Sequence, residues 1–254
     1  MPKSNPSIDL NGDVGEGAST DREFIPLLTS VNVACGGHAG DERTMTQAIE
    51  SAIAAGVQVG AHPGFADREH FGRRELNVSA DEVFALITRQ LDFFRRLASQ
   101  VGVELAHVKL HGALYHQAAR DPALAVAAVR AIIAIDRRAV LVGPWQTAIE
   151  RAADEANLRF AREGFADRAY DVDGLLIPRT DPRALITNVN QAVSQALMIA
   201  REGKVTSADG VQLPMPADTI CLHGDNSDAI AFATGVRSAL TAAGIALRSF
   251  ACEA

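Results

Sequence analysis

The chain has 254 residues, 48% of them hydrophobic, which is enough apolar material for one sizeable core. A net charge of -7 argues against a nucleic-acid partner, and no apolar run approaches the roughly 20 residues of a membrane span. The N-terminus lacks the apolar segment of a signal peptide, and the three cysteines have unrelated spacings. We therefore expect a cytoplasmic protein with free thiols, folded as a single domain over residues 1–254.

Seven short β-type runs follow one another along the chain, and helical patterns separate most of them. The runs cover residues 7–13, 30–36, 57–64, 106–113, 139–144, 158–164 and 219–225. Ser79 and Glu82 have the spacing of a capping box, and the Asp-Pro pairs at 121–122 and 181–182 predict two further helix starts. A hairpin is expected over 203–218, around Asp209-Gly210.

The C-terminal part of the chain continues the alternation. A last helix at about 226–243 is expected to end at Gly244, and residues 244–250 are either one more strand or a tail. Strand and helix alternating in this way indicate a mostly parallel sheet with both faces covered, either closed or open. The sequence has neither G-x-G-x-x-G after its first strand nor a P-loop motif. We predict an α/β fold with a parallel β/α barrel of seven, or eight, strands.

Polar residues recur where the predicted strands end, usually beside glycines. They are Asn11, Asp13 and Glu16, then His38, His62, Lys109, His111, Glu163, His223 and Asp225. The carboxyl ends of parallel strands form the ligand face of barrels and doubly wound sheets alike. We therefore expect these side chains, and the four histidines above all, to line one cleft.

Lys109 and the repeated pentapeptide GFADR are the two most informative details. Lys109 alternates with Val108 and Leu110, so it faces the barrel interior, where an ammonium group needs a carboxylate or a ligand. His111 points to the same side. GFADR occurs at 64–68 and 164–168, and its arginines, Arg68 and Arg168, are candidates for binding an anionic group of the substrate at the mouth.

Six sequence blocks resemble the signature blocks of the LamB/YcsF family. They are DLNGDVGEG, NVACGGHAGD, GAHPGFADR, VKLHGALYH, REGFADRAYDVDGLLIPR and CLHGD. The resemblance extends over about residues 8–250 and implies a seven-stranded barrel of the glycoside hydrolase/deacetylase type. It also implies the A subunit of an ATP-hydrolysing 5-oxoprolinase, which converts 5-oxo-L-proline to L-glutamate together with B and C subunits.

The polar residues are compatible with such a reaction. Opening a lactam with water needs a base and a stabiliser for the developing charge. Asp13, Glu163 and Asp225 are candidate bases, Lys109 is the candidate stabiliser, and His111 or His223 could carry protons. Asn11 and Glu16, with Arg68 and Arg168, are candidates for binding the substrate. The missing P-loop is consistent with an ATP site on the partner subunits.

Two other classes of function remain open at this stage. A stand-alone metal-dependent deacetylase or amidohydrolase would hold a divalent ion on Asp13, His38 and His62, by analogy with deacetylase-type barrels. Alternatively, the chain is a ligand-binding or scaffold subunit without catalytic residues of its own. The sequence does not determine which subunit binds ATP, whether a metal is bound, or whether the chain forms a homo-oligomer.

Overall fold

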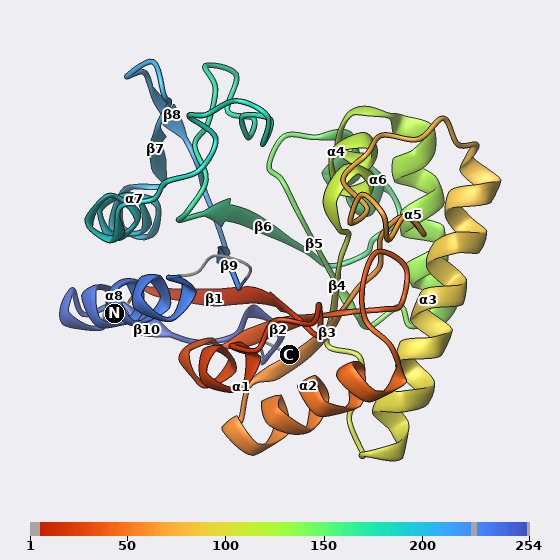
Figure 1. Cartoon of the computed structure of the whole chain (residues 1–254). Coiled ribbons are helices and arrows are strands. Elements are labelled where there is room, and N and C mark those ends of the chain that lie inside the picture. The colour runs from red at the N-terminus through yellow and green to blue at the C-terminus, as the bar shows by residue number, and fades with distance from the viewer. Residues whose placement is uncertain (1–5, 225–227, 253–254) are drawn as a thin grey trace, which may run out of the picture.

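The computed structural model describes residues 6–224 and 228–252, in which seven parallel strands close into a barrel (Figure 1). The strands are β1 (Ser7–Val14), β2 (Ser30–Ala34), β3 (Gln58–His62), β4 (His107–Lys109), β5 (Val140–Gly143), β6 (Phe160–Phe165) and β9 (Thr219–His223). The ring closes because β1 pairs with both β2 and β9. An eighth strand, β10 (Ala246–Leu247), pairs with Ser7 and Ile8 outside that ring. The predicted fold class is therefore confirmed.

Helices cover the outside of the barrel. They are α1 (Asp21–Phe24), α2 (Glu42–Ala55), α3 (Ala80–Gln100), α4 (Gly112–Arg120), α5 (Pro122–Ile135), α6 (Ala148–Glu155), α7 (Val189–Glu202) and α8 (Ala229–Ala242), with short 3-10 turns at Ile25–Leu27 and Phe250–Cys252. The capping box of Ser79 and Glu82 and the Asp121 cap are both present. Among the described residues, no helix combines the length and the apolarity needed to span a membrane.

The helix predicted from Asp181-Pro182 begins later than expected, at Val189, with Asn188 as its cap. The Asp181 carboxylate instead accepts the main-chain N–H of Arg183 in a tight turn. The segment after this turn is held extended, because the main chain of Ala184 and Ile186 bonds to the loop after β6. Tertiary hydrogen bonds thus override a local helix-start signal.

The predicted hairpin is present as β7 (Lys204–Thr206) and β8 (Gln212–Pro214), which pair antiparallel. The main-chain N–H of Ala208 donates to Tyr170 O over 2.8 Å, so the hairpin packs on the loop that follows β6. Figure 1 shows this hairpin, that loop and α7 together on one side of the barrel. They form a wall beside the C-terminal ends of the strands.

The barrel interior is filled with polar side chains in layers. In the lowest layer, the hydroxyls of Ser30 and Thr29 donate to the Asp9 carboxylate over 2.8 and 2.6 Å, and Thr219 also donates to it. The next layer contains Asn32, whose side-chain oxygen lies 2.8 Å from His107 Nε2. All of these groups are buried except Thr29, which is partly buried. Gly60 is required beside this layer, because a Cβ there would collide with the His107 imidazole. The lower interior is thus closed.

We expect Asp9 to make the stability of the wild type depend on pH. Burial raises its pKa from 3.8 to about 6, although the hydroxyls around it oppose that shift. Because the folded state holds the proton more tightly, this stability is present below about pH 4 and is lost as pH rises through about 6. A shift of about two units corresponds to about 3 kcal/mol. Urea unfolding should be measured for the wild type and Asp9→Asn from pH 4 to 7. The difference between their free energies of unfolding should change over this range, and a difference that stays constant would contradict the prediction.

Candidate active site

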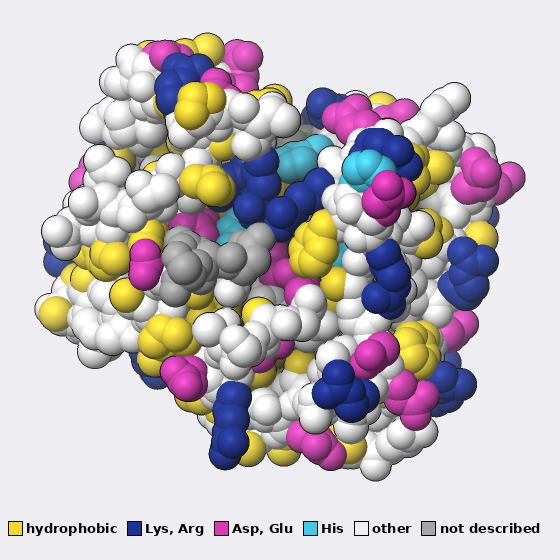
Figure 2. Space-filling view, viewed as in Figure 1, with side chains coloured by type: hydrophobic (Ala, Val, Ile, Leu, Met, Phe, Trp, Pro, Cys, Tyr) yellow, Lys and Arg dark blue, Asp and Glu magenta, His cyan; other side chains and the backbone are white. Residues whose placement is uncertain are grey.

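The C-terminal ends of the strands bring most of the predicted site residues into one region. Those present are Asn11, Asp13, Glu16, His38, His62, Lys109, His111, Glu163 and His223, all buried or partly buried, whereas Asp225 lies outside the described residues. Figure 2 shows a hollow over this end of the barrel, in which histidine, acidic and basic side chains are visible. The region combines both signs of charge with several imidazoles.

Lys109 lies at the centre of the region. Its Nζ is 2.9 Å from Glu163 Oε1 and 3.1 Å from Asp13 Oδ1, and it also donates to Asn11 Oδ1 and Cys221 Sγ. Burial favours the neutral amine, but Asp13, Cys221 and Glu163 raise the pKa of Lys109 well above 10.5. The side chain therefore remains an ammonium ion in a buried site, as its inward position on β4 predicted.

Asp13 connects Lys109 to the histidines. Its Oδ1 accepts from Lys109 and from Asn32 Nδ2 (2.9 Å), while its Oδ2 lies 3.3 Å from His62 Nε2. Burial alone would raise the pKa of Asp13, but His62 and Lys109 hold it well below 3.8. Asp13 is thus a carboxylate. Asn32 is a site residue that the sequence did not reveal, because an asparagine within an apolar strand carries no local signal.

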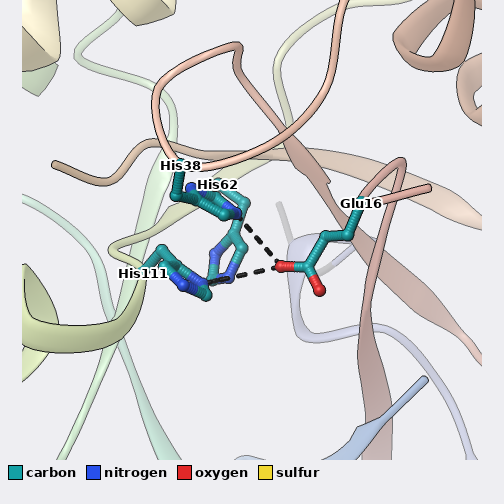
Figure 3. A group of neighbouring side chains, drawn as sticks. All are labelled: Glu16, His38, His62 and His111. Atoms are coloured by element: carbon teal, nitrogen blue, oxygen red, sulfur yellow. Dashed lines mark hydrogen bonds and ion pairs between the residues drawn. The ribbon is translucent and has the colours of Figure 1, made fainter. Parts of the chain in front are cut away.

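Three histidines and Glu16 form a compact group, which we call the histidine cluster (Figure 3). Glu16 Oε1 lies 3.1 Å from His38 Nε2 and 3.6 Å from His111 Nδ1, and His111 Nδ1 lies 2.9 Å from His62 Nε2. Burial lowers the pKa of His38 to about 2 and that of His111 well below 6.5. The expected metal set of Asp13, His38 and His62 is only partly gathered here, since Asp13 groups instead with Cys221 and His223.

His223 is held by Asp167, a residue that the sequence analysis did not single out. The His223 Nδ1 lies 3.0 Å from each carboxylate oxygen of Asp167, and the main-chain N–H of His223 donates to Oδ2 over 2.8 Å. Burial would raise the pKa of Asp167, but His223 holds it below 3.8. A carboxylate accepts only, so Nδ1 carries a proton and Nε2 is the nitrogen available for proton transfer.

The two GFADR copies place their arginines on main-chain carbonyls. Arg68 Nη2 donates to Gly36 O (3.1 Å) and Gly40 O, whereas Arg168 donates to Ile177 O (2.7 Å) and Ala184 O (3.2 Å). Arg168 is buried, at 4% exposure. These contacts brace neighbouring loops, and the anion-binding role that the repeat suggested stays a prediction.

Arg73 is a better-placed basic residue at the mouth. It is exposed, and its guanidinium lies 4.7 Å from the centre of the Phe71 ring. That ring in turn lies edge-on to His38 and His111. Arg73 lies in the loop between β3 and α3, and the sequence analysis gave it no role.

The chain is similar to known proteins over nearly its whole length. A family profile described as the LamB/YcsF family matches residues 8–254. The chain is 47% identical over 244 residues to the 5-oxoprolinase A subunit of Methylococcus capsulatus, covering 94% of each chain. It is 44% identical over 250 residues to the 5-oxoprolinase A subunit of Bordetella pertussis, covering 96% of this chain and 99% of the relative.

Solved structures of similar fold were also found. A lactam utilization protein from Thermus thermophilus superposes with a TM-score of 0.90 at 41% identity, covering 96% of this chain and all of the other. A peptidoglycan deacetylase from Bacillus subtilis superposes with a TM-score of 0.51 at 12% identity, covering 97% of this chain and 89% of the other. The second likeness is one of fold alone.

Proposed function

The chain belongs to the LamB/YcsF family, and we propose that it is the A subunit of a 5-oxoprolinase, which opens the lactam of 5-oxoproline to give glutamate. Relatives at 44–47% identity carry that name over nearly their full length, and the similar Thermus structure is a lactam utilization protein. The observation that carries the proposal is the buried Lys109 ammonium between two carboxylates at the ligand face.

Lactam opening assigns a role to each group around Lys109. Water must attack the amide carbon, so negative charge develops on the lactam oxygen, and a fixed buried cation stabilises that charge. Asp13 and Glu163 are the candidate bases for the water, and Asp225 stays a candidate outside the described residues. His223, oriented by Asp167, is the candidate to protonate the departing nitrogen, and His111 is a second candidate.

Substrate contacts are assigned from position. Glu16 reaches the histidine cluster from the loop after β1 and is a candidate acceptor for the lactam N–H. Asn11 donates to Glu163 and Thr219 and accepts from Lys109, so we assign it to holding the charged groups. For the carboxylate of 5-oxoproline we propose Arg73, because it is exposed at the mouth beside the Phe71 ring, and Arg68 and Arg168 stay candidates.

We further propose that opening depends on ATP and that the ATP site lies on the B and C partners. An amide is a poor electrophile, and phosphorylation of its oxygen would make its carbon a better one for water. The C–N bond then breaks as the nitrogen is protonated, and the resulting acyl phosphate is hydrolysed by a second water to glutamate and phosphate. The absence of a P-loop motif from the sequence is consistent with this division. Buried thiols at Cys35 and Cys221 are consistent with work in a reducing cytoplasm.

A stand-alone metal-dependent amidohydrolase is the second candidate, and the histidine cluster favours it. A scaffold role is the third, but it leaves the buried charge of Lys109 without a function. The candidates differ in what the isolated chain can do and in what it needs from partners.

The test is glutamate release from 5-oxoproline by the purified chain, alone and with candidate B and C subunits, with and without ATP. We expect release only with partners and ATP, and little ATP turnover by the chain alone. ATP-independent hydrolysis of acetylated amides by the isolated chain would instead support the amidohydrolase. Full glutamate release by B and C without this chain would contradict a catalytic role.

A further inference from the structure

We propose that Glu16, His62 and His111 bind one divalent transition-metal ion, and that His38 holds two of these ligands in position. The three ligands come from the ends of three different strands, β1, β3 and β4, so only the folded chain assembles them. The reaction that this ion would serve rests on the proposed function, whereas binding of the ion can be measured on the chain alone.

Main-chain carbonyls fix which ring nitrogens carry protons. His62 Nδ1 lies 2.8 Å from Lys109 O, and His111 Nε2 lies 2.8 Å from Phe71 O. A carbonyl oxygen only accepts, so each of these nitrogens carries the N–H. With those tautomers, His62 Nε2 and His111 Nδ1 face each other over 2.9 Å, and Asp13 Oδ2 lies 3.3 Å from the same His62 nitrogen. Two lone pairs at 2.9 Å repel, so a proton or a metal ion must lie between the two nitrogens, and the Asp13 carboxylate favours either cation.

Donation of the second ring nitrogen to a carbonyl is also the usual support of metal-bound histidine. His62 and His111 both have it, and their ring planes are 88° apart, so each can direct its lone pair along its own plane to a shared point. Tetrahedral zinc with bonds of about 2.0–2.1 Å requires ligand atoms about 3.3 Å apart. His62 Nε2 and His111 Nδ1 are 2.9 Å apart, and His111 Nδ1 and Glu16 Oε1 are 3.6 Å apart. These two distances lie on either side of the value that zinc requires.

His38 is assigned a positioning role because of its ring geometry. It stacks on His111 with ring centres 3.5 Å apart and planes only 5° from parallel. Two parallel stacked rings cannot both hold one ion in their planes. His38 instead presses on the His111 ring, and its Nε2 lies 3.1 Å from Glu16 Oε1, where it can donate. Glycines permit this packing, since a Cβ at Gly64 or Gly72 would come within 2.8 Å of His38.

The ligand chemistry specifies the class of ion. Two neutral imidazoles with one carboxylate suit zinc and its neighbours in the first transition row, and they are a poor set for magnesium or calcium. Three protein ligands leave a position open, as catalytic metal sites do. An ion there could polarise the lactam carbonyl beside Lys109. A single proton shared by His62 and His111 is the rival occupant.

The test is zinc binding by the full chain after treatment with a chelator, measured by competition with a chromophoric chelator and repeated with cobalt for its visible spectrum. We expect one ion per chain and the intense absorption of low-symmetry, near-tetrahedral cobalt. Glu16→Gln, His62→Gln and His111→Gln should each weaken binding by at least about 100-fold, and His38→Gln by about 10–100-fold. His70→Asn, which removes a half-exposed histidine of the neighbouring loop, should bind like the wild type.

Circular dichroism tests whether each variant is folded. Glu16→Gln is the variant least expected to disturb folding, because Glu16 lies at the rim of the cluster. Absence of stoichiometric binding, or equal binding by all four cluster variants, would overturn the proposal in favour of the shared proton. Loss of binding in Cys221→Ser alone would also overturn it, by moving the ion to the Asp13, Cys221 and His223 group. Full lactam opening by metal-free chain would leave the proposed function standing, whereas a metal-loaded chain inactive with its partners would count against that function alone.

Discussion

Lys109→Met is expected to reduce glutamate release by the assembled complex about 10²–10³-fold, the usual loss when one stabiliser of developing charge is removed. Methionine preserves most of the aliphatic stem, so the loss falls on the ammonium group. The same substitution leaves Asp13 and Glu163 without their shared cation in a buried site. We therefore also expect a loss of stability, at roughly 3–5 kcal/mol for a broken buried pair.

The control for Lys109→Met must be equally destabilised but chemically intact. Leu10→Ala meets that need, because Leu10 is fully buried, and truncation of a buried leucine costs about 2–5 kcal/mol. Turnover should be measured per folded molecule, at a temperature where both variants are folded. If Lys109→Met then turns over like Leu10→Ala, Lys109 is structural and its assignment is wrong.

Asp167→Asn is expected to reduce lactam opening about 10²–10⁴-fold, the range that a positioned acid or base contributes. Asn can still contact His223, but its amide can turn either its oxygen or its NH2 group to the ring and so no longer fixes Nδ1 as the donor. Steady-state glutamate release by the assembled complex measures the loss.

The other GFADR copy supplies a matched control. Asp67 bonds to His70 over 2.9 Å, as Asp167 bonds to His223, but His70 is 41% exposed and outside the candidate active site. Asp67→Asn should therefore leave the rate close to the wild type. An equal loss in both variants would mean that the GFADR aspartates support loops, and that Asp167 does not act through His223.

The side chains at the strand ends could be predicted, because residues alternate in direction along a strand and because glycines mark where several strands end. Lys109 alternates with apolar neighbours, which fixed its inward direction, and glycines after β2, β3 and β4 marked where each strand ends. The alternation of strands and helices indicated a mostly parallel sheet, and the missing G-x-G-x-x-G motif favoured a closed barrel over an open sheet. These patterns predict which side chains lie at one end of the fold. For that reason the sequence alone predicts that His38, His62 and His111 lie close together.

Partners of these side chains could not be predicted, because they depend on distances across the barrel. Nothing beside Asn32 in the sequence tells that it reaches Asp13, and nothing beside Arg168 tells that carbonyls 9 and 16 residues later take up its guanidinium. The late start of α7 has the same origin, since the main-chain bonds of Ile186 and Ala184 to the loop after β6 are tertiary. The two GFADR copies are identical in sequence, yet only one of their aspartates holds a histidine of the candidate active site.

The polar layers around Asp9 and His107 also restrict how a small molecule can reach the barrel interior. In the part of the chain that the structure describes, the filled lower interior leaves one approach to Lys109, from the end of the barrel that carries Glu16 and Arg73. On the proposed function, 5-oxoproline enters and glutamate leaves by this same approach. A partner protein bound over it must therefore uncover it once in each catalytic cycle.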